Sequence, residues 1–295
     1  MFQDDSGFQI KVNELLVGLL FAFIWAIFSS RIAWQKKLFA PFSINKTSPI
    51  ESKNVCIGFG LFLFMQILVI PFLIGQIYLF MTGRTWLPGQ LDPIQKTGIN
   101  LLILIGTYLS LTFYYFKYFN AQQKKAIFGI HGRGFKNYCL GASTWFFIYP
   151  VVLSCSLLID IAILIFFRQE PLEQYAVEQF RLAASHPTLL IGMGLTIPFL
   201  VPIAEEFLFR GLLQSWLKKK LNSPLIGIIL AAAIFSLFHY SSSQGVTNIQ
   251  LFISLFLLGC FLGYLYEKYQ TIWAPIGLHS MFNAMSAILI LMGSE

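Results

Sequence analysis

The stretch TLLIGMGLTIPFLVPIAEEFLFRGLL, residues 188–213, decides how this chain folds. It is apolar over most of its length, and a helix of about twenty apolar residues crosses the roughly 30 Å hydrocarbon core of a bilayer. Two adjacent carboxylates, Glu205 and Glu206, nevertheless lie within it. A charged side chain at the centre of a bilayer costs about 2.5 to 3.5 kcal/mol even on the mildest insertion scales, so these two charges require partners or a function.

The composition of the whole chain is that of an integral membrane protein. Of its 295 residues, 57% are hydrophobic and only 11% are charged. The apolar segments between the charge clusters predict an all-α fold, a polytopic membrane helix bundle with about eight transmembrane helices. The predicted spans are residues 14–34, 55–81, 97–116, 143–167, 188–213, 224–239, 249–266 and 272–292.

The net charge of +7 comes from basic residues that lie in alternate loops. Fourteen Lys and Arg residues follow spans one, three, five and seven, and five lie on the other side. This asymmetry follows the positive-inside rule, so it predicts a multi-pass protein of the cell or cytoplasmic membrane with both termini extracytoplasmic. Since the rule accounts for the basic residues, no nucleic-acid partner is expected. The first span is expected to be retained, because acidic residues precede it and no small-residue cleavage site follows.

Most of the chain before residue 187 contains few ionisable groups within its spans. Residues 1–186 are therefore expected to form scaffold helices and loops. The connector at residues 168–187 carries several acidic residues and is interpreted as a solvated loop, in preference to an amphipathic interfacial helix.

Within the fifth span, the two glutamates face different directions. Glu206 and Arg210 are four residues apart and share a helix face, whereas Glu205 is rotated by about 100°. Arg210 can therefore neutralise Glu206 and leave Glu205 available. The ion pair could equally serve only to stabilise helix packing. Arg210 could instead bind a substrate carboxylate, since its planar guanidinium suits a bidentate contact. The packing role does not account for Glu205, and pairing with Glu206 competes with a substrate contact of Arg210.

Three further polar residues are expected near Glu205. Glu205 and His239 are each seventeen residues from Asn222, so an antiparallel hairpin turning at Asn222 places them at about equal depth. On the last span, His279 and Asn283 are four residues apart and share a face. A single histidine in a span usually serves packing, but two histidines with a carboxylate and an amide favour a functional site.

Three short motifs follow one another on these spans: EExxxR in EEFLFR, FxxxH in FSLFH, from Phe235 to His239, and HxxxN in HSMFN. In this order they resemble the CAAX protease and bacteriocin-processing (CPBP, or Abi) family of intramembrane endopeptidases, which includes the type II CAAX prenyl endopeptidases. The resemblance covers residues 187–283. It implies a catalytic transmembrane core over residues 187–295, beside the scaffold helices of residues 1–186.

Amide hydrolysis requires an activated water and a stabilised oxyanion. A glutamate among apolar side chains can both take and return a proton, so Glu205 is the expected general base. His239 can hold the water, and His279 and Asn283 can donate hydrogen bonds to the oxyanion. The resemblance implies the same roles, with Glu206, Arg210 and Phe235 in support. The expected substrate is a membrane-tethered or lipidated peptide.

Other chemistries remain possible for these residues. Glu205, His239 and His279 would make a three-ligand zinc site, but the HExxH motif that makes a zinc prediction specific is absent, so a mechanism without a cofactor is favoured. A proton-coupled transporter also uses carboxylates and histidines within the membrane, and Pro198 and Pro202 interrupt span five, but no internal repeat supports that reading. A non-catalytic immunity or assembly protein could keep the scaffold, although the complete set of motif residues disfavours it.

Overall fold

The computed structural model describes residues 5–41, 46–85, 91–130, 132–170, 172 and 175–293. Every regular element in these ranges is helical, as the hydrophobic pattern predicted. The elements are α1 (Asp5–Gln35), α2 (Ser52–Phe64), η1 (Met65–Val69), α3 (Ile70–Thr82), α4 (Pro93–Tyr118), α5 (Ala121–Phe128), α6 (Gly134–Phe167), α7 (Tyr175–Ala184), α8 (Pro187–Leu195), η3 (Thr196–Leu200), α9 (Val201–Glu206), η4 (Phe207–Gln214), α10 (Ser215–Lys220), α11 (Pro224–Leu237), η5 (Ser242–Gln244), α12 (Thr247–Tyr269) and α13 (Trp273–Met292).

Seven helical stretches in the described residues are long and apolar enough to cross a membrane. The eighth apolar helix, α11, has 14 residues. At 1.5 Å per residue it measures about 21 Å, which is shorter than the roughly 30 Å of a hydrocarbon core. Helix α11 ends at Leu237, close to the predicted end of span six, and His239 lies in the turn that follows. The protein is a multi-pass bundle of roughly eight spans.

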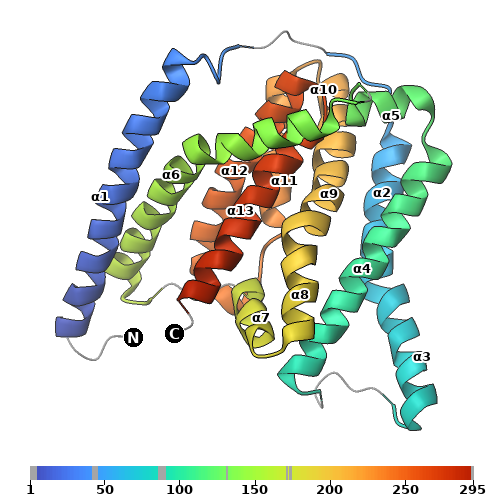
Figure 1. Ribbon diagram of the computed structural model, residues 1–295, viewed down its shortest axis with the longest axis horizontal. Coiled ribbons are helices and arrows are strands. Elements are labelled where there is room, and N and C mark those ends of the chain that lie inside the picture. The colour runs from blue at the N-terminus through green and yellow to red at the C-terminus, as the bar shows by residue number, and fades with distance from the viewer. Residues whose placement is uncertain are drawn as a thin grey trace.

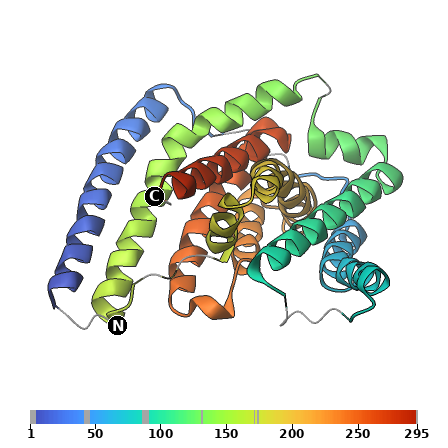
Figure 2. The same cartoon turned by 60° about the horizontal axis from the view of Figure 1, so that its bottom comes forward.

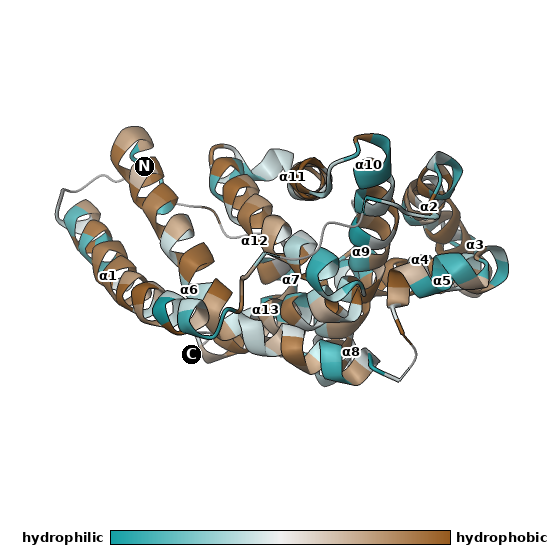
Figure 3. Ribbon diagram, turned by 90° about the horizontal axis from the view of Figure 1, so that it is seen from above, coloured by the Kyte–Doolittle hydropathy of each residue, from teal (hydrophilic) through white to brown (hydrophobic). Residues whose placement is uncertain are grey.

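The helices of the last third form the centre of this bundle. Figure 1 shows α9, α11, α12 and α13 in the middle, α1 and α6 on one side, and α2, α3 and α4 on the other. Helices α1 and α6 run side by side in both Figure 1 and Figure 2. The start of α1 and the end of α13 lie at the lower side of Figure 1, while α5 and α10 lie at the upper side and are largely hydrophilic in Figure 3.

The connector at residues 168–187 does not remain a loop, and that interpretation is wrong for α7. Phe180 and Ala183, which are 3% and 0% exposed, pack with Met193 of α8 and Ala287 of α13. The two residues are spaced by three along the chain and so share a helix face. This apolar face covers the end of the bundle beside α8 and α13.

The stretch that carries the two glutamates is one helical run, in which α-helical turns alternate with wider π-helical turns at η3 and η4. Within η3, the Val201 N–H bonds to the Thr196 carbonyl, and Pro202 has no N–H. The Ile197 carbonyl is therefore left without either usual helical partner. Asn283 of α13 donates its Nδ2–H to this carbonyl at 3.0 Å, which ties α13 to the interrupted part of the helix.

The turn from α10 to α11 uses the capping residues that the sequence offers. Asn222 adopts a left-handed φ of 51°, the Ser223 side chain accepts from the Ile226 N–H at 3.3 Å, and Pro224 begins the new helix. Asparagine tolerates the left-handed region, and serine is a favoured N-cap. This tight reversal sends α11 back alongside η4.

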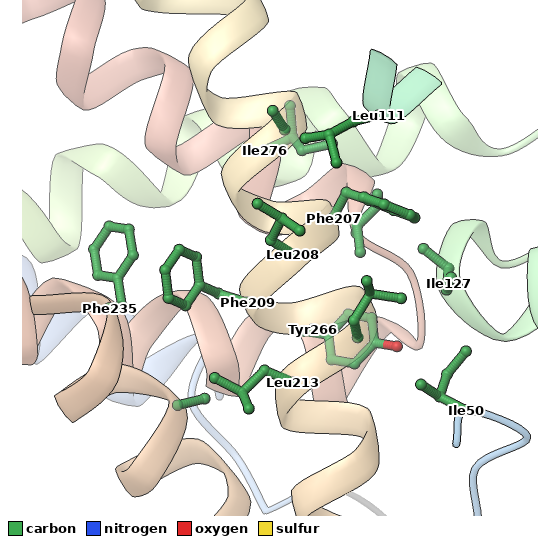
Figure 4. Packing of buried hydrophobic residues seen from close by; sticks show 14 of the residues in the cluster. Ile50, Leu111, Ile127, Phe207, Leu208, Phe209, Leu213, Phe235, Tyr266 and Ile276 are labelled. Atoms are coloured by element: carbon green, nitrogen blue, oxygen red, sulfur yellow. The ribbon is translucent and has the colours of Figure 1, made fainter. Parts of the chain in front are cut away.

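Apolar side chains of η4 form the centre of the main core. Phe207, Leu208 and Phe209 are 5% exposed or less. Figure 4 shows Phe209 pointing to Phe235 of α11, and their rings meet edge to face with centroids 5.2 Å apart. Aromatic pairs favour this geometry. The core therefore fixes η4, which directly follows the turn that carries Glu205, and α11, which directly precedes His239.

Helices α6 and α13 approach closely because two glycines lie at their crossing. A Cβ on Gly141 of α6 would come within 1.8 Å of the Ala274 carbonyl oxygen. A Cβ on Gly277 of α13 would come within 2.0 Å of the Tyr138 carbonyl oxygen. Only glycine fits at such distances, so these two positions set the placement of α13.

Candidate active site

Glu206 lies at the centre of a buried polar cluster. Its Oε1 accepts from Arg210 Nη1 at 3.1 Å and from His279 Nδ1 at 2.8 Å. Arg210 Nη2 donates to the Gly259 carbonyl at 3.2 Å, and its guanidinium lies 4.6 Å from the Phe235 ring centroid. The Glu206 and Arg210 side chains are both 0% exposed. The predicted ion pair is thus present, and Arg210 is enclosed within the protein.

The two imidazoles are oriented by acceptors on their Nδ1 atoms. His239 Nδ1 lies 2.9 Å from the Phe235 carbonyl, and His279 Nδ1 lies 2.8 Å from Glu206. A carbonyl and an ionised carboxylate can only accept, so both Nδ1 atoms carry a proton. In the neutral imidazole, Nε2 then presents a lone pair. The site fixes the orientation of both rings through the atoms that face away from Glu205.

Glu205 lies between the two Nε2 atoms. Its Oε1 is 3.9 Å from His239 Nε2, and its Oε2 is 3.7 Å from His279 Nε2. Both distances exceed those of hydrogen bonds between nitrogen and oxygen. The buried Oε2 atom has no hydrogen-bond partner among the described residues. Glu206 is therefore the neutralised carboxylate, and Glu205, which is 17% exposed, is the one that remains available to a reactant.

The Phe235 ring packs against both histidines. Its centroid is 4.8 Å from that of His239 and 5.9 Å from that of His279, and the second contact is perpendicular. Phe235 is 0% exposed. Because its carbonyl and its ring both contact His239, it supports the placement of the imidazoles around Glu205.

Glu205, His239 and His279 thus converge from three different elements. Asn283 lies one turn beyond His279 on α13 and contacts the Ile197 carbonyl. Exposure differs among these side chains: His239 is 33% exposed and His279 only 5%. The Glu205 carboxyl is therefore more open on the His239 side, at the end of the short helix α11.

Sequence reasoning missed two contacts within this cluster. It paired Glu206 only with Arg210 and did not connect it to His279, and it did not connect Asn283 to Ile197. Both contacts join α13 to the helical run that carries the glutamates, and the residues are 73 and 86 positions apart in sequence. A spacing rule within one helix contains no information about them.

A second set of polar contacts was also missed, although its spacing is visible in the sequence. Gln214 Nε2 donates to the Gly263 carbonyl and to Glu267 Oε1, each at 3.1 Å. Lys218 Nζ donates to both Glu267 oxygens, at 2.8 and 3.1 Å, and the pair is almost fully buried. Residues 206, 210, 214 and 218 recur every four positions, as do residues 259, 263 and 267. We call this arrangement the polar ladder; it holds α12 beside η4 and α10.

Gly259 and Gly263, spaced by four residues on α12, lie within this ladder. A Cβ on Gly259 would be 2.9 Å from Ala232 Cβ, and one on Gly263 would be 2.7 Å from Gln214 Oε1. Small residues let helix backbones approach closely in membranes. These two glycines therefore allow α12 to pack closely against α11 and η4, and their carbonyls also serve as hydrogen-bond acceptors.

Within the described part of the chain, no group of three or more His, Cys, Asp or Glu side chains is arranged to hold a metal ion. The cluster that these residues do form is a carboxylate between two imidazoles, with a second carboxylate oriented by an arginine behind it. Such an arrangement can take, hold and return a proton.

Comparison with known proteins gives one match. The family described as type II CAAX prenyl endopeptidase Rce1-like matches residues 187–285, a range that contains Glu205, His239, His279 and Asn283. No curated protein and no solved structure matches the chain. The family match indicates a protease and confirms the resemblance drawn from the three motifs. Residues 187–285 are therefore a domain of the Rce1-like type II CAAX prenyl endopeptidase (CPBP) family.

Proposed function

We propose that this protein is an intramembrane endopeptidase that hydrolyses a peptide bond in a membrane-tethered or lipidated peptide, with Glu205 as the general base. The observation that carries the proposal is the Glu205 carboxyl itself. It lies between two imidazole Nε2 atoms, and neither of its oxygens is hydrogen-bonded within the described residues, whereas Oε1 of Glu206 accepts from both Arg210 and His279. The family match supports protease chemistry and a membrane-tethered or lipidated peptide as the substrate.

The proposed reaction begins when Glu205 removes a proton from a water molecule. The water oxygen forms a bond to the substrate carbonyl carbon, and the carbonyl oxygen takes up the negative charge. The oxyanion then re-forms the carbonyl double bond of the new carboxylic acid while the carbon–nitrogen bond breaks, and Glu205 returns its proton to the leaving nitrogen. His239 supports the first step, because its Nε2 lone pair lies beside Glu205 and can accept a hydrogen bond from the water.

His279 and Asn283 are the proposed donors to the oxyanion. For His279 this role requires a proton on Nε2 in addition to the one on Nδ1, so the ring must be an imidazolium. Its Nδ1 donates to Glu206 Oε1 at 2.8 Å, which holds the ring in place. The Asn283 amide has two N–H bonds, of which one is directed to the Ile197 carbonyl. The other can serve the oxyanion.

The proposal is tested by comparing membranes that carry wild-type protein with membranes that carry Glu205→Gln. This substitution keeps the shape of the side chain and removes the base, so cleavage should fall by about 10² to 10⁴-fold, the usual contribution of a general base. Quantitative proteomics of both membranes should identify peptides that remain uncleaved only with the variant.

The matched control is Glu14→Gln, which removes one carboxylate from the exposed surface of α1. It should cleave the same peptides as the wild type. Wild-type cleavage by Glu205→Gln protein, present at equal abundance, would refute the assignment of the base.

A further inference from the structure

A polar cavity of about 510 Å³ lies beside α5, α10 and the turn between α12 and α13, and none of the four proposed catalytic residues lines it. Among the residues that the structure describes, its wall contains four basic side chains and no acidic one: Lys125, Arg133, Lys218 and Lys268. We call it the basic cavity.

One of these positive charges is balanced by a carboxylate. Lys218 is paired with the buried Glu267, so its charge is balanced. Lys268 donates to the Leu38 carbonyl, which carries no net charge. Lys125 and Arg133 are exposed, and neither forms an ion pair within the described ranges. The wall therefore presents a net positive charge, with Lys125 and Arg133 available to a ligand.

An apolar cavity of about 660 Å³ adjoins the basic one, and Lys125, Gly129 and Ile130 line both. Leu111 of α4 and Phe207 of η4 are among the apolar residues of its wall. The two cavities thus place an apolar compartment directly beside a cationic one. They lie beside α5, whose hydrophilic residues mark one face of the bundle in Figure 3. This is the arrangement expected at the boundary between the hydrocarbon and the polar headgroups.

We propose that the two adjoining cavities bind one anionic phospholipid, with its phosphate in the basic cavity and an acyl chain in the apolar cavity. Basic pockets between membrane helices are suited to anionic headgroups, and charge-assisted hydrogen bonds from Lys and Arg to phosphate oxygens are strong. A soluble phosphate would fill only the basic cavity and would leave the apolar wall without a partner. This inference does not require Glu205 to be the general base, although Ala204, its neighbour in the chain, lines the apolar cavity.

The test titrates the purified full chain in detergent micelles with a short-chain phosphatidylglycerol, or with phosphatidylcholine that has the same chains. Native mass spectrometry measures the bound lipid. Wild-type protein should bind phosphatidylglycerol at least tenfold more tightly than phosphatidylcholine. The double variant Lys125→Ala/Arg133→Ala should weaken phosphatidylglycerol binding by about ten- to thirtyfold.

The matched control is Lys219→Ala/Lys220→Ala, which removes the same charge from exposed residues of α10 outside both cavities. It should keep the preference for phosphatidylglycerol. A third variant, Thr112→Trp, adds bulk to the wall of the apolar cavity and should weaken lipid binding without changing the binding of inorganic phosphate.

Three results would overturn the proposal. Equal losses in the two double variants would mean that binding reflects only the general charge of this face. Displacement of the lipid by an equal concentration of inorganic phosphate would identify a site for soluble anions. Unchanged lipid binding by Thr112→Trp would exclude an acyl chain from the apolar cavity.

Discussion

Replacing Gly277 by alanine tests how far the catalytic geometry depends on the contact between α13 and α6. The new Cβ would lie 2.0 Å from the Tyr138 carbonyl oxygen and 2.9 Å from the Ala142 nitrogen, whereas ordinary contact begins at 3.4 Å. Both neighbours are backbone atoms of α6 and cannot rotate away. The two helices would therefore have to separate locally by about 1.4 Å, the difference between the shorter distance and ordinary contact.

His279 is two residues further along α13, so it should move with the backbone of Gly277. Its Nδ1 is 2.8 Å from Glu206, and a displacement of this size would break that hydrogen bond. A misplacement of about 1 Å can lower a catalytic rate by about 100-fold. Overpacking typically costs about 1 to 3 kcal/mol of stability. We therefore expect Gly277→Ala to lower both kcat and the thermal stability.

The assay measures cleavage of a peptide identified in the Glu205→Gln comparison, together with the unfolding temperature in detergent. Gly60→Ala is the matched control, because a Cβ at Gly60 of α2 would meet no atom of the described residues within 4 Å. Alanine is favoured over glycine in a helix by about 1 kcal/mol, so this control should keep full activity and equal or higher stability. Wild-type kcat and unfolding temperature in Gly277→Ala would refute the close crossing and the dependence of His279 upon it.

Two further predictions concern buried polar groups. Glu267→Leu leaves the Lys218 ammonium buried without its partner, so the free energy of unfolding should fall by about 3 to 5 kcal/mol. Lys218→Met/Glu267→Leu should recover most of that loss in a denaturant titration, and a double variant as unstable as the single one would contradict this reading. Asn283→Ala removes the donor to the Ile197 carbonyl, so it should cost about 1 to 3 kcal/mol of stability. It should also lower kcat by about 10² to 10³-fold if it serves the oxyanion, and an unchanged unfolding temperature would contradict the structural part of this prediction.

The sequence predicted the fold class and much of the cluster because both depend on short-range regularities. Apolar segment length predicted the spans, and the equal distances of Glu205 and His239 from Asn222 predicted that they would meet. The prediction succeeded because Asn222, Ser223 and Pro224 form a tight reversal at that point.

What the sequence could not provide is the rotation of one helix relative to another. The contact between His279 and Glu206 depends on the orientation of α13, which the Gly141 and Gly277 contacts with α6 determine. The wrong interpretation of α7 has a similar origin. Its charged residues suggested a solvated loop, but Phe180 and Ala183 pack against residues of α8 and α13 that are distant in the sequence.

Between Glu206 and Lys218 the chain passes from the π-helical turns of η4 to the α-helical turns of α10, and this change has an angular consequence. Each α-helical residue advances about 100° around the axis, so every step of four residues overshoots a full circle by about 40°. Three such steps would carry Lys218 away from the side on which Glu206 lies. The wider π-helical turns of η4 rotate by fewer degrees per residue about the helix axis. Each four-residue step within η4 therefore compensates for the excess rotation of an α-helical step. Deleting a single residue from η4 would restore α-helical rotation along this segment. The side chains that now contact α12 would then be rotated away from it.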